Sequence, residues 1–322
     1  MKSRIPLIVA ILLATFALGF AGSRLVSSVP HSPPPAHASL PPALASYLGT
    51  FEPGAPSDYG LVASFARTAN RQPNLVGYYS GWTQPFDIAS ARMLQAHGAV
   101  PFVQIDPTAA SIKAIANGTY DDYLRSYADS VRNFRHAVVI GFGHEMNASW
   151  YPWGYKRVPA ATFVGAWRHI VTLFREEGAR NVTWLWTLQA VEPGTGPIAS
   201  WWPGAQYVTW VGIDGFYYRP SDTFASVFGK TITQVRTFTS KPVLLSETAV
   251  GPAVGSTADL LAKIQDLFHG MARYRTLGLV WFDKTQHGSI FHQDWRLADN
   301  PFAEISFRLG VRQELAPYHP IG

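Results

Sequence analysis

Eight short apolar runs recur along the chain from about residue 45 onward, and longer helical patterns separate them. The runs are continuous rather than alternating, which is typical of strands that are covered on both faces of a parallel sheet. They span Tyr47–Phe51, Leu75–Tyr79, Val100–Ile105, Val138–Phe142, Val182–Leu188, Val208–Ile213, Val243–Leu245 and Leu279–Phe282. The helical patterns span Ser57–Thr68, Asp87–His97, Tyr120–Phe134, Ala160–Glu177, Phe224–Phe238, Thr257–Phe268 and Asn300–Leu309. Eight strands in this order predict an α/β fold, a closed parallel (β/α)8 TIM barrel in a single domain, rather than an open sheet.

The N-terminus has the features of an export signal or a membrane anchor. Lys2 and Arg4 precede an apolar run over residues 5–20 that is followed by small residues, which is the order found in signal peptides. We expect residues 1–22 to be a signal peptide cleaved after Ala21, with an uncleaved anchor as the alternative. Six prolines lie between Val29 and Pro42, so residues 23–44 are predicted to be a Pro-rich linker and residues 45–322 the barrel. This organisation predicts a protein that is secreted or anchored to the outer face of the cytoplasmic membrane.

Composition excludes several other classes of protein. The net charge of +5 is spread along 322 residues without a run of Lys or Arg, so the sequence predicts no nucleic-acid partner. The absence of cysteine excludes disulfides, a thiolate nucleophile and a Cys-based metal site. We expect no metal and no organic cofactor, and we expect a monomer. Aromatic residues make up 14% of the chain and charged residues 15%, which favours an ordered core with aromatic surface left for a ligand.

The segment from Gly141 to Gly154 concentrates the most unusual chemistry of the chain. Glu145 follows the predicted strand Val138–Phe142, and Trp150, Tyr151 and Trp153 come shortly after it. A buried and unpaired carboxylate would be costly, and an ordinary loop does not cluster aromatic rings. Flat apolar rings beside a carboxylic acid suit a sugar-binding cleft in which a glycosidic oxygen needs a proton.

A second glutamate, Glu247, follows the predicted strand Val243–Leu245. In parallel barrels the catalytic groups lie at the C-terminal ends of the strands, so Glu145 and Glu247 are predicted to face the same mouth. Two carboxyl groups across such a cleft can cleave a glycosidic bond, because one protonates the leaving oxygen while the other attacks or activates water.

The neighbours of Glu145 leave two interpretations open. His144 is either a hydrogen-bonded histidine at a strand end or a contact to a sugar hydroxyl, and Asn147 either binds substrate or caps the following turn. A zinc-protease motif would need a second histidine where Ala148 stands, and a dinucleotide fingerprint would need glycine where Met146 stands. Neither of those chemistries is supported.

Further candidates lie at the ends of the sixth and eighth strands. Tyr217 or Tyr218 could donate a hydrogen bond to the strand-seven carboxylate and hold it ionised. Trp281 could form the floor of a sugar site, with burial in the core as the alternative.

The third strand and the link after the fifth strand add weaker candidates. Gln104 and Asp106 could bind sugar hydroxyls, although Asp106 before a proline is also typical of a turn at a helix start. Trp201 and Trp202 could line an outer subsite.

These motifs together resemble glycoside hydrolase family 26, the family of retaining β-mannanases and related β-glucanases on a (β/α)8 barrel. Three segments carry the resemblance, which extends over residues 47–309: Gly143-His144-Glu145-Met146-Asn147-Ala148-Ser149-Trp150-Tyr151-Pro152-Trp153-Gly154, Trp210-Val211-Gly212-Ile213-Asp214-Gly215-Phe216-Tyr217, and Ser246-Glu247-Thr248. The histidine before the acid is the most specific feature, because related barrel glycosidases usually have asparagine there.

The resemblance implies that residues 45–322 are a glycoside hydrolase catalytic domain, with Glu145 as acid/base and Glu247 as nucleophile. It also implies substrate contacts or support of the nucleophile by four further residues: His144, Trp150, Tyr217 and Trp281. Trp153 and Asn147 fall within the same motif and are expected to line the sugar site. Ala148 replaces the usual glycine, and Gln104-Ile105-Asp106-Pro107 lacks the His and Trp associated with mannan-specific members. The substrate is therefore expected to be β-mannan, β-1,4/β-1,3-glucan or another surface polysaccharide.

The sequence thus predicts a secreted or surface-tethered retaining endo-β-glycanase that hydrolyses a polysaccharide by double displacement. The alternatives are a catalytically silent carbohydrate-binding barrel, a scaffold protein in cell-surface polysaccharide assembly, and a retaining barrel glycosidase of another family.

Overall fold

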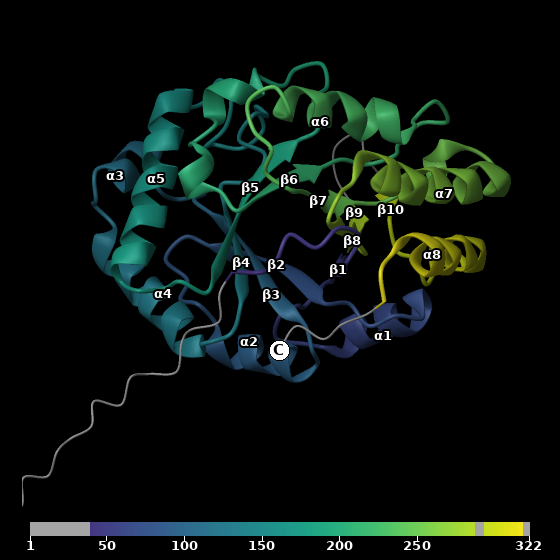
Figure 1. Ribbon diagram of the computed structural model, residues 1–322, viewed down its shortest axis with the longest axis horizontal. Coiled ribbons are helices and arrows are strands. Elements are labelled where there is room, and N and C mark those ends of the chain that lie inside the picture. The colour runs from purple at the N-terminus through teal and green to yellow at the C-terminus, as the bar shows by residue number, and fades with distance from the viewer. Residues whose placement is uncertain (1–38, 287–292, 318–322) are drawn as a thin grey trace, which may run out of the picture. The chain divides into compact units, whose positions relative to one another are not determined.

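The computed structural model describes residues 39–286 and 293–317, and in them the chain forms the predicted closed parallel barrel (Figure 1). The predicted signal or anchor segment and most of the predicted linker lie outside these residues. Neighbouring strands pair in sequence order, and β8 closes the barrel by pairing with β1. The strands are β1 Tyr47–Phe51, β2 Leu75–Gly81, β3 Val100–Asp106, β4 Val138–Phe142, β5 Val182–Gln189, β6 Trp210–Asp214, β7 Val243–Thr248 and β8 Gly278–Phe282. The predicted fold class is confirmed.

Helices cover the outside of this sheet (Figure 1). They are α1 Gly60–Ala69, α2 Ile88–Ala96, α3 Ile112–Ala116, α4 Asp121–Phe134, α5 Ala160–Glu176, α6 Lys230–Val235, α7 Thr257–Tyr274 and α8 Pro301–Glu314. Helix α4 buries Leu124, Tyr127, Ala128 and Val131, whose spacing places them on one helical face. Two short strands, β9 Thr285–Gln286 and β10 Gln293–Asp294, pair antiparallel after β8. None of the helices within the described ranges is both long enough and apolar enough to cross a membrane.

The helices differ from the prediction in two places. The predicted helix Phe224–Phe238 is divided into a π-helical turn, η3 Ala225–Gly229, and α6. Helix α3 was not predicted, because its five residues are too few to show a periodic pattern. Between β5 and β6, where no helix was predicted, the chain forms only two 3₁₀ turns, η1 Ile198–Trp201 and η2 Ala205–Tyr207.

Side chains alternate between two cores along every strand. One set, including Phe51, Phe102 and Val280, fills the inside of the barrel, and the other packs between the sheet and the helices. The interior is tight, since a Cβ at Gly77 would lie 2.5 Å from ring atoms of Phe51. Glycine on β2 is therefore required for the Phe51 ring to occupy the barrel interior.

The chain enters the barrel at the N-terminal ends of the strands. Leu40 is buried among the interior residues, and its backbone N–H donates to Thr183 Oγ1 at 2.8 Å. The Tyr47 hydroxyl donates to the Pro41 carbonyl oxygen at 2.6 Å. The linker was expected to extend to residue 44, whereas Leu40 already belongs to the packed barrel.

Candidate active site

The turn after β4 positions Glu145. Gly143 and Glu145 both have φ of +54°, in the left-handed region. Glycine is needed at the first position because a Cβ would lie 2.8 Å from the Phe163 ring. At Glu145 this conformation costs on the order of 1–3 kcal/mol, so the surrounding structure must hold it. The Glu145 N–H donates to the Thr187 carbonyl of β5 at 3.0 Å, and the Glu145 carbonyl accepts from the Ala148 N–H at 2.8 Å.

A β-bulge in β7 positions Glu247. Ile213 of β6 pairs with Leu245, but the next residue, Asp214, pairs with Glu247, so β7 contains one extra residue at this point. Pairing with β8 shows the same irregularity between Leu245 and Thr248. Regular alternation would direct Glu247 outward with Leu245. The extra residue reverses this alternation and places the carboxyl group at the mouth of the barrel.

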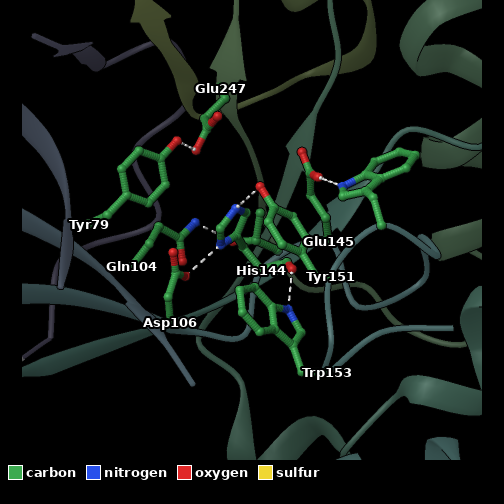
Figure 2. A network of polar contacts seen from close by, with 10 residues as sticks. Tyr79, Gln104, Asp106, His144, Glu145, Tyr151, Trp153 and Glu247 are labelled. Carbon is green, nitrogen blue, oxygen red and sulfur yellow. Dashed lines mark hydrogen bonds and ion pairs between the residues drawn. The ribbon is translucent and has the colours of Figure 1, made fainter. Parts of the chain in front are cut away.

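The two glutamates are buried and have different hydrogen-bond donors. Glu145 is 7% exposed, and its Oε2 accepts a bond from the Trp150 indole N–H at 2.7 Å. Glu247 is 4% exposed, and its Oε1 accepts a bond from the Tyr79 hydroxyl at 2.6 Å. Figure 2 shows the two carboxyl groups on either side of His144 and Tyr151, in one network of polar contacts. The structure thus brings together the two acids that the sequence separates by about 100 residues.

Burial and neighbouring charges set the protonation of these acids. The pKa of Glu145 is raised to about 7, mainly by burial. The charge of His144 lowers this pKa, and the charge of Glu247 raises it. Burial also raises the pKa of Glu247, but His144, the Tyr79 hydroxyl and Lys284 all counteract this by stabilising the carboxylate. A carboxyl group that titrates near neutral pH can act first as an acid and then as a base.

His144 lies between a third acid, Asp106, and the hydroxyl of Tyr151. Its Nδ1 lies 2.9 Å from Asp106 Oδ1, and its Nε2 lies 3.0 Å from the Tyr151 hydroxyl. Burial lowers the pKa of His144, but the hydrogen bond and charge of Asp106, together with the charges of Glu145 and Glu247, raise it to about 9. At neutral pH His144 is therefore a cation, and the Nδ1–H donates to Asp106.

Asp214, at the end of β6, is a further buried acid beneath the two glutamates. Its Oδ1 accepts from the Ser246 hydroxyl at 2.6 Å, within the barrel. Burial, then the charges of Glu247 and Glu145, raise the pKa of Asp214 well above its usual value. Hydrogen bonds from the Ser246 side chain and the Glu247 backbone partly offset this rise in the pKa of Asp214.

Two of the predicted site residues point away from the mouth. Tyr217 is fully buried and its hydroxyl donates to Asp266 of α7 at 3.0 Å, so the prediction that it supports the strand-seven carboxylate is wrong. Trp281 is 1% exposed, and its ring lies 5.1 Å from that of Phe307 on α8. It shares the outward orientation of Leu279, so its predicted role as a sugar floor is also wrong.

Three more predicted contacts are buried behind the site. Both polar atoms of the Asn147 amide bond the backbone of Gln189, which ties the loop after β4 to the end of β5. Gln104 donates to Thr187 at 3.1 Å inside the barrel. The Trp153 indole donates to the His144 carbonyl oxygen at 2.8 Å. These side chains shape the loop that carries Glu145, and their burial contradicts direct contact with a sugar.

Trp150 is the predicted aromatic contact that keeps an accessible ring, with 52% of the residue exposed. Asp106 is partly exposed beside His144 and can reach a ligand. Trp201 is buried, and Trp202 is half-buried with its ring 5.1 Å from Trp186. The Trp150 ring can therefore stack on a sugar at the mouth.

The sequence interpretation missed Tyr79 and Lys284. Tyr79 belongs to β2 and supplies the hydrogen bond to Glu247 that was expected from Tyr217. Lys284 follows β8, and its Nζ lies 5.1 Å from the centroid of the Tyr79 ring. Both residues lie at strand ends, so the rule that found the two glutamates could have found them. Within the described ranges, no three His, Asp or Glu side chains form a cluster that could hold a metal ion.

A closed parallel barrel with two buried glutamates of unlike surroundings at its mouth defines the class of barrel glycoside hydrolases. The family model described as glycosyl hydrolase family 26 matches residues 103–299, and the chain belongs to this family. The family membership that the sequence motifs indicated is confirmed.

Curated relatives cover the chain unevenly. It is 26% identical over 282 residues to Endoglucanase H of Acetivibrio thermocellus, a match that covers 83% of this chain and 30% of that protein. It is 23% identical over 187 residues to "Mannan endo-1,4-beta-mannosidase A and B" of Caldalkalibacillus mannanilyticus, which covers 54% of this chain and 34% of that protein. The chain thus spans about a third of the length of these relatives.

Solved structures of similar fold include mannanase man26 of Bacillus subtilis, with a TM-score of 0.61 and 15% identity over 87% of this chain and 91% of that one. The GH26 domain of an endo-beta-mannanase/endo-beta-glucanase from Prevotella bryantii has a TM-score of 0.58 and 13% identity, covering 83% and 92%. At these identities the likeness establishes the fold.

Proposed function

We propose that the chain is a retaining endo-β-glycanase that hydrolyses a β-linked polysaccharide, with Glu247 as the nucleophile and Glu145 as the acid/base. The observation that carries this proposal is the unlike surroundings of the two buried acids. Glu145 has a pKa of about 7, whereas Glu247 receives the Tyr79 hydroxyl and lies near the cations of His144 and Lys284. Environments that separate two carboxyl groups in this way assign the acid and the anion.

In the first step, the Glu247 carboxylate attacks the anomeric carbon while Glu145 gives its proton to the glycosidic oxygen. The bond between the anomeric carbon and that oxygen breaks, and a glycosyl ester forms on Glu247. In the second step, Glu145 takes a proton from water, the water oxygen attacks the anomeric carbon, and the Glu247 carboxylate is released. The exposed ring of Trp150 beside Glu145 offers a face for the leaving sugar.

The proposed substrate is β-mannan or a β-1,4/β-1,3-glucan. The relative named an endoglucanase aligns with 83% of the chain and the one named a mannosidase with 54%. The end of β3, with Gln104 buried and Asp106 held by His144, lacks the His and Trp expected of mannan-specific members. A β-glucan is therefore the first substrate to test.

The test is release of reducing ends from mannan, mixed-linkage glucan, cellulose and xylan, followed by alanine variants of each glutamate. We expect Glu247→Ala to abolish turnover and Glu145→Ala to be rescued by azide on substrates with activated leaving groups. Azide reaches the anomeric carbon of the glycosyl ester only where the Glu145 side chain is absent. Wild-type rates in either variant would contradict the assignment, and retention of glycan without product would favour a binding or scaffold protein.

We further propose that the protein acts outside the cytoplasm. The order of charged, apolar and small residues over residues 1–22 supports export or anchoring, and the prolines of the linker support an extended spacer. N-terminal sequencing of the protein from its native membrane and medium fractions would distinguish cleavage after Ala21 from retention as an anchor.

A further inference from the structure

Cations that are scattered along the sequence gather at one end of the barrel. Five of the loops that lead from a helix into the next strand contain exposed or half-buried cations. In the first of them, Arg71 donates to the Ala316 carbonyl oxygen. We call the cations of the other four loops the basic ring: Arg135, Arg180, Arg236, Lys241 and Arg275. Each such loop lies at the N-terminal end of its strand, opposite the mouth that holds Glu145. The repeated βα order therefore collects residues that are up to 140 positions apart on one face.

The charge of this ring is not neutralised locally. Within the described parts of the chain, no ion pair within 4.0 Å involves a member of the ring. The one acid in the four loops, Glu177, already pairs with Arg125 of α4. Arg236 donates instead to the backbone carbonyl oxygen of Lys241, at 2.7 Å. The ring thus presents net positive charge to solvent.

The opposite end of the barrel combines both signs of charge, because Lys284 and the His144 cation lie among its acids. Acids cluster where the strands end: Glu52, Asp106, Glu145, Glu247 and Asp283. The two ends therefore differ: the basic ring contains cations without ion pairs within the described ranges, whereas the mouth contains acids and cations together. Such an asymmetry orients a protein at a charged surface.

Helix dipoles explain only part of this arrangement. Arg135 and Arg275 are the C-cap residues of α4 and α7, where a cation stabilises the helix end. Arg180 and Lys241 lie four residues beyond α5 and six beyond α6, and the dipole effect falls off within the last turn. Arg180 and Lys241 therefore do not stabilise the ends of these helices.

The chain itself joins the barrel at this face. Leu40 packs into the barrel at the N-terminal ends of the strands, so the described part of the chain begins at the face of the basic ring. The sequence before it contains Lys2, Arg4 and an apolar run over residues 5–20. Leu44, on the same side, is 41% exposed. We propose that the basic ring docks on an anionic lipid bilayer and directs the mouth away from it.

The test uses the full chain, which has no native cysteine and accepts a single label. A dye on Ser240→Cys reports the basic ring, and a dye on Ser221→Cys reports the mouth; both serines are exposed. Each labelled protein is reconstituted with vesicles of phosphatidylcholine alone or with one quarter phosphatidylglycerol, with a quencher on the headgroups. We expect quenching at Ser240→Cys with anionic vesicles only, reversal at high salt, and none at Ser221→Cys.

The matched variants remove three charges each. Arg135→Gln, Arg180→Gln and Arg275→Gln together should weaken docking roughly 100-fold, because each cation near an anionic bilayer contributes a factor of about five. The control removes three exposed cations elsewhere, Arg92, Lys113 and Lys230, and should retain docking. Equal quenching in neutral vesicles, equal loss in both triple variants, or quenching at the mouth would overturn the proposal. Binding of a short DNA duplex by the ring, without vesicle docking, would assign the face to nucleic acid instead.

Discussion

Replacing Tyr79 by phenylalanine tests how the barrel controls its nucleophile. The Tyr79 hydroxyl donates to Glu247 Oε1 at 2.6 Å in a partly buried site, and it lowers the pKa of that carboxyl group. A hydrogen bond to a charged group contributes about 1.5–3 kcal/mol, which corresponds to about one to two pKa units. Tyr79→Phe should therefore raise the pKa of Glu247 by about that amount.

The pH profile of kcat/KM measures this shift, because its acidic limb reports the group that must be ionised and its alkaline limb the group that must be protonated. In the proposed mechanism these groups are Glu247 and Glu145. In Tyr79→Phe the acidic limb should move to higher pH while the alkaline limb, near pH 7, stays in place. The pH range of maximal kcat/KM then narrows, and the maximal value of kcat/KM falls.

Tyr217→Phe is the matched control, since it removes the same hydroxyl from a buried tyrosine that bonds Asp266 outside the site. It should cost about 1 kcal/mol of stability and leave both limbs unchanged. An acidic limb that moves by less than about 0.3 units in Tyr79→Phe would refute the reasoning.

Three further predictions follow from the same network. Trp150→Phe removes the indole donor that lowers the pKa of Glu145, so the alkaline limb should move to higher pH by about one unit. Asp106→Asn removes the anion that raises the pKa of His144 to about 9, and an NMR titration should show a lower pKa. The raised pKa of His144 stabilises the folded wild type fully below about pH 6.5, and this stabilisation disappears as pH rises through 9. Denaturant unfolding should therefore show the wild type to be more stable than Asp106→Asn by up to about 3 kcal/mol, at low pH only. Trp281→Ala should lower stability by about 3–5 kcal/mol in thermal unfolding, while the KM of the folded fraction stays unchanged because the ring packs outside the barrel.

The barrel and the position of its two glutamates at the mouth were predictable because they follow from simple periodicities. Continuous apolar runs give parallel strands, and acids directly after such runs reach a common mouth. The prediction even placed Glu247 correctly at the mouth, although it did not foresee the extra residue in β7 that directs the side chain there. A bulge of this kind has no signature in the sequence of a short buried strand.

The aromatic residues were less predictable, because an aromatic ring suits both a core and a sugar site. Strand alternation directs Trp281 toward α8 and Tyr217 hydrogen-bonds α7, while Tyr79 reaches Glu247. The sequence does not show which residues of each strand point toward the barrel interior and which toward the helices. It therefore could not decide which of these aromatic residues contacts Glu247. The basic ring could not be predicted for a different reason. Its cations are spread along the chain, and only the closed βα topology brings them to one end of the barrel.

Trapping the glycosyl-enzyme tests the central claim most directly. A 2-deoxy-2-fluoro glycoside with a good leaving group slows both steps, and the loss of its leaving group leaves the sugar as an ester on the nucleophile. Peptide mass spectrometry should then find one fluorosugar on Glu247 in the wild type and none in Glu247→Ala. An adduct on another residue, or turnover that yields the inverted anomer without an adduct, would contradict the account.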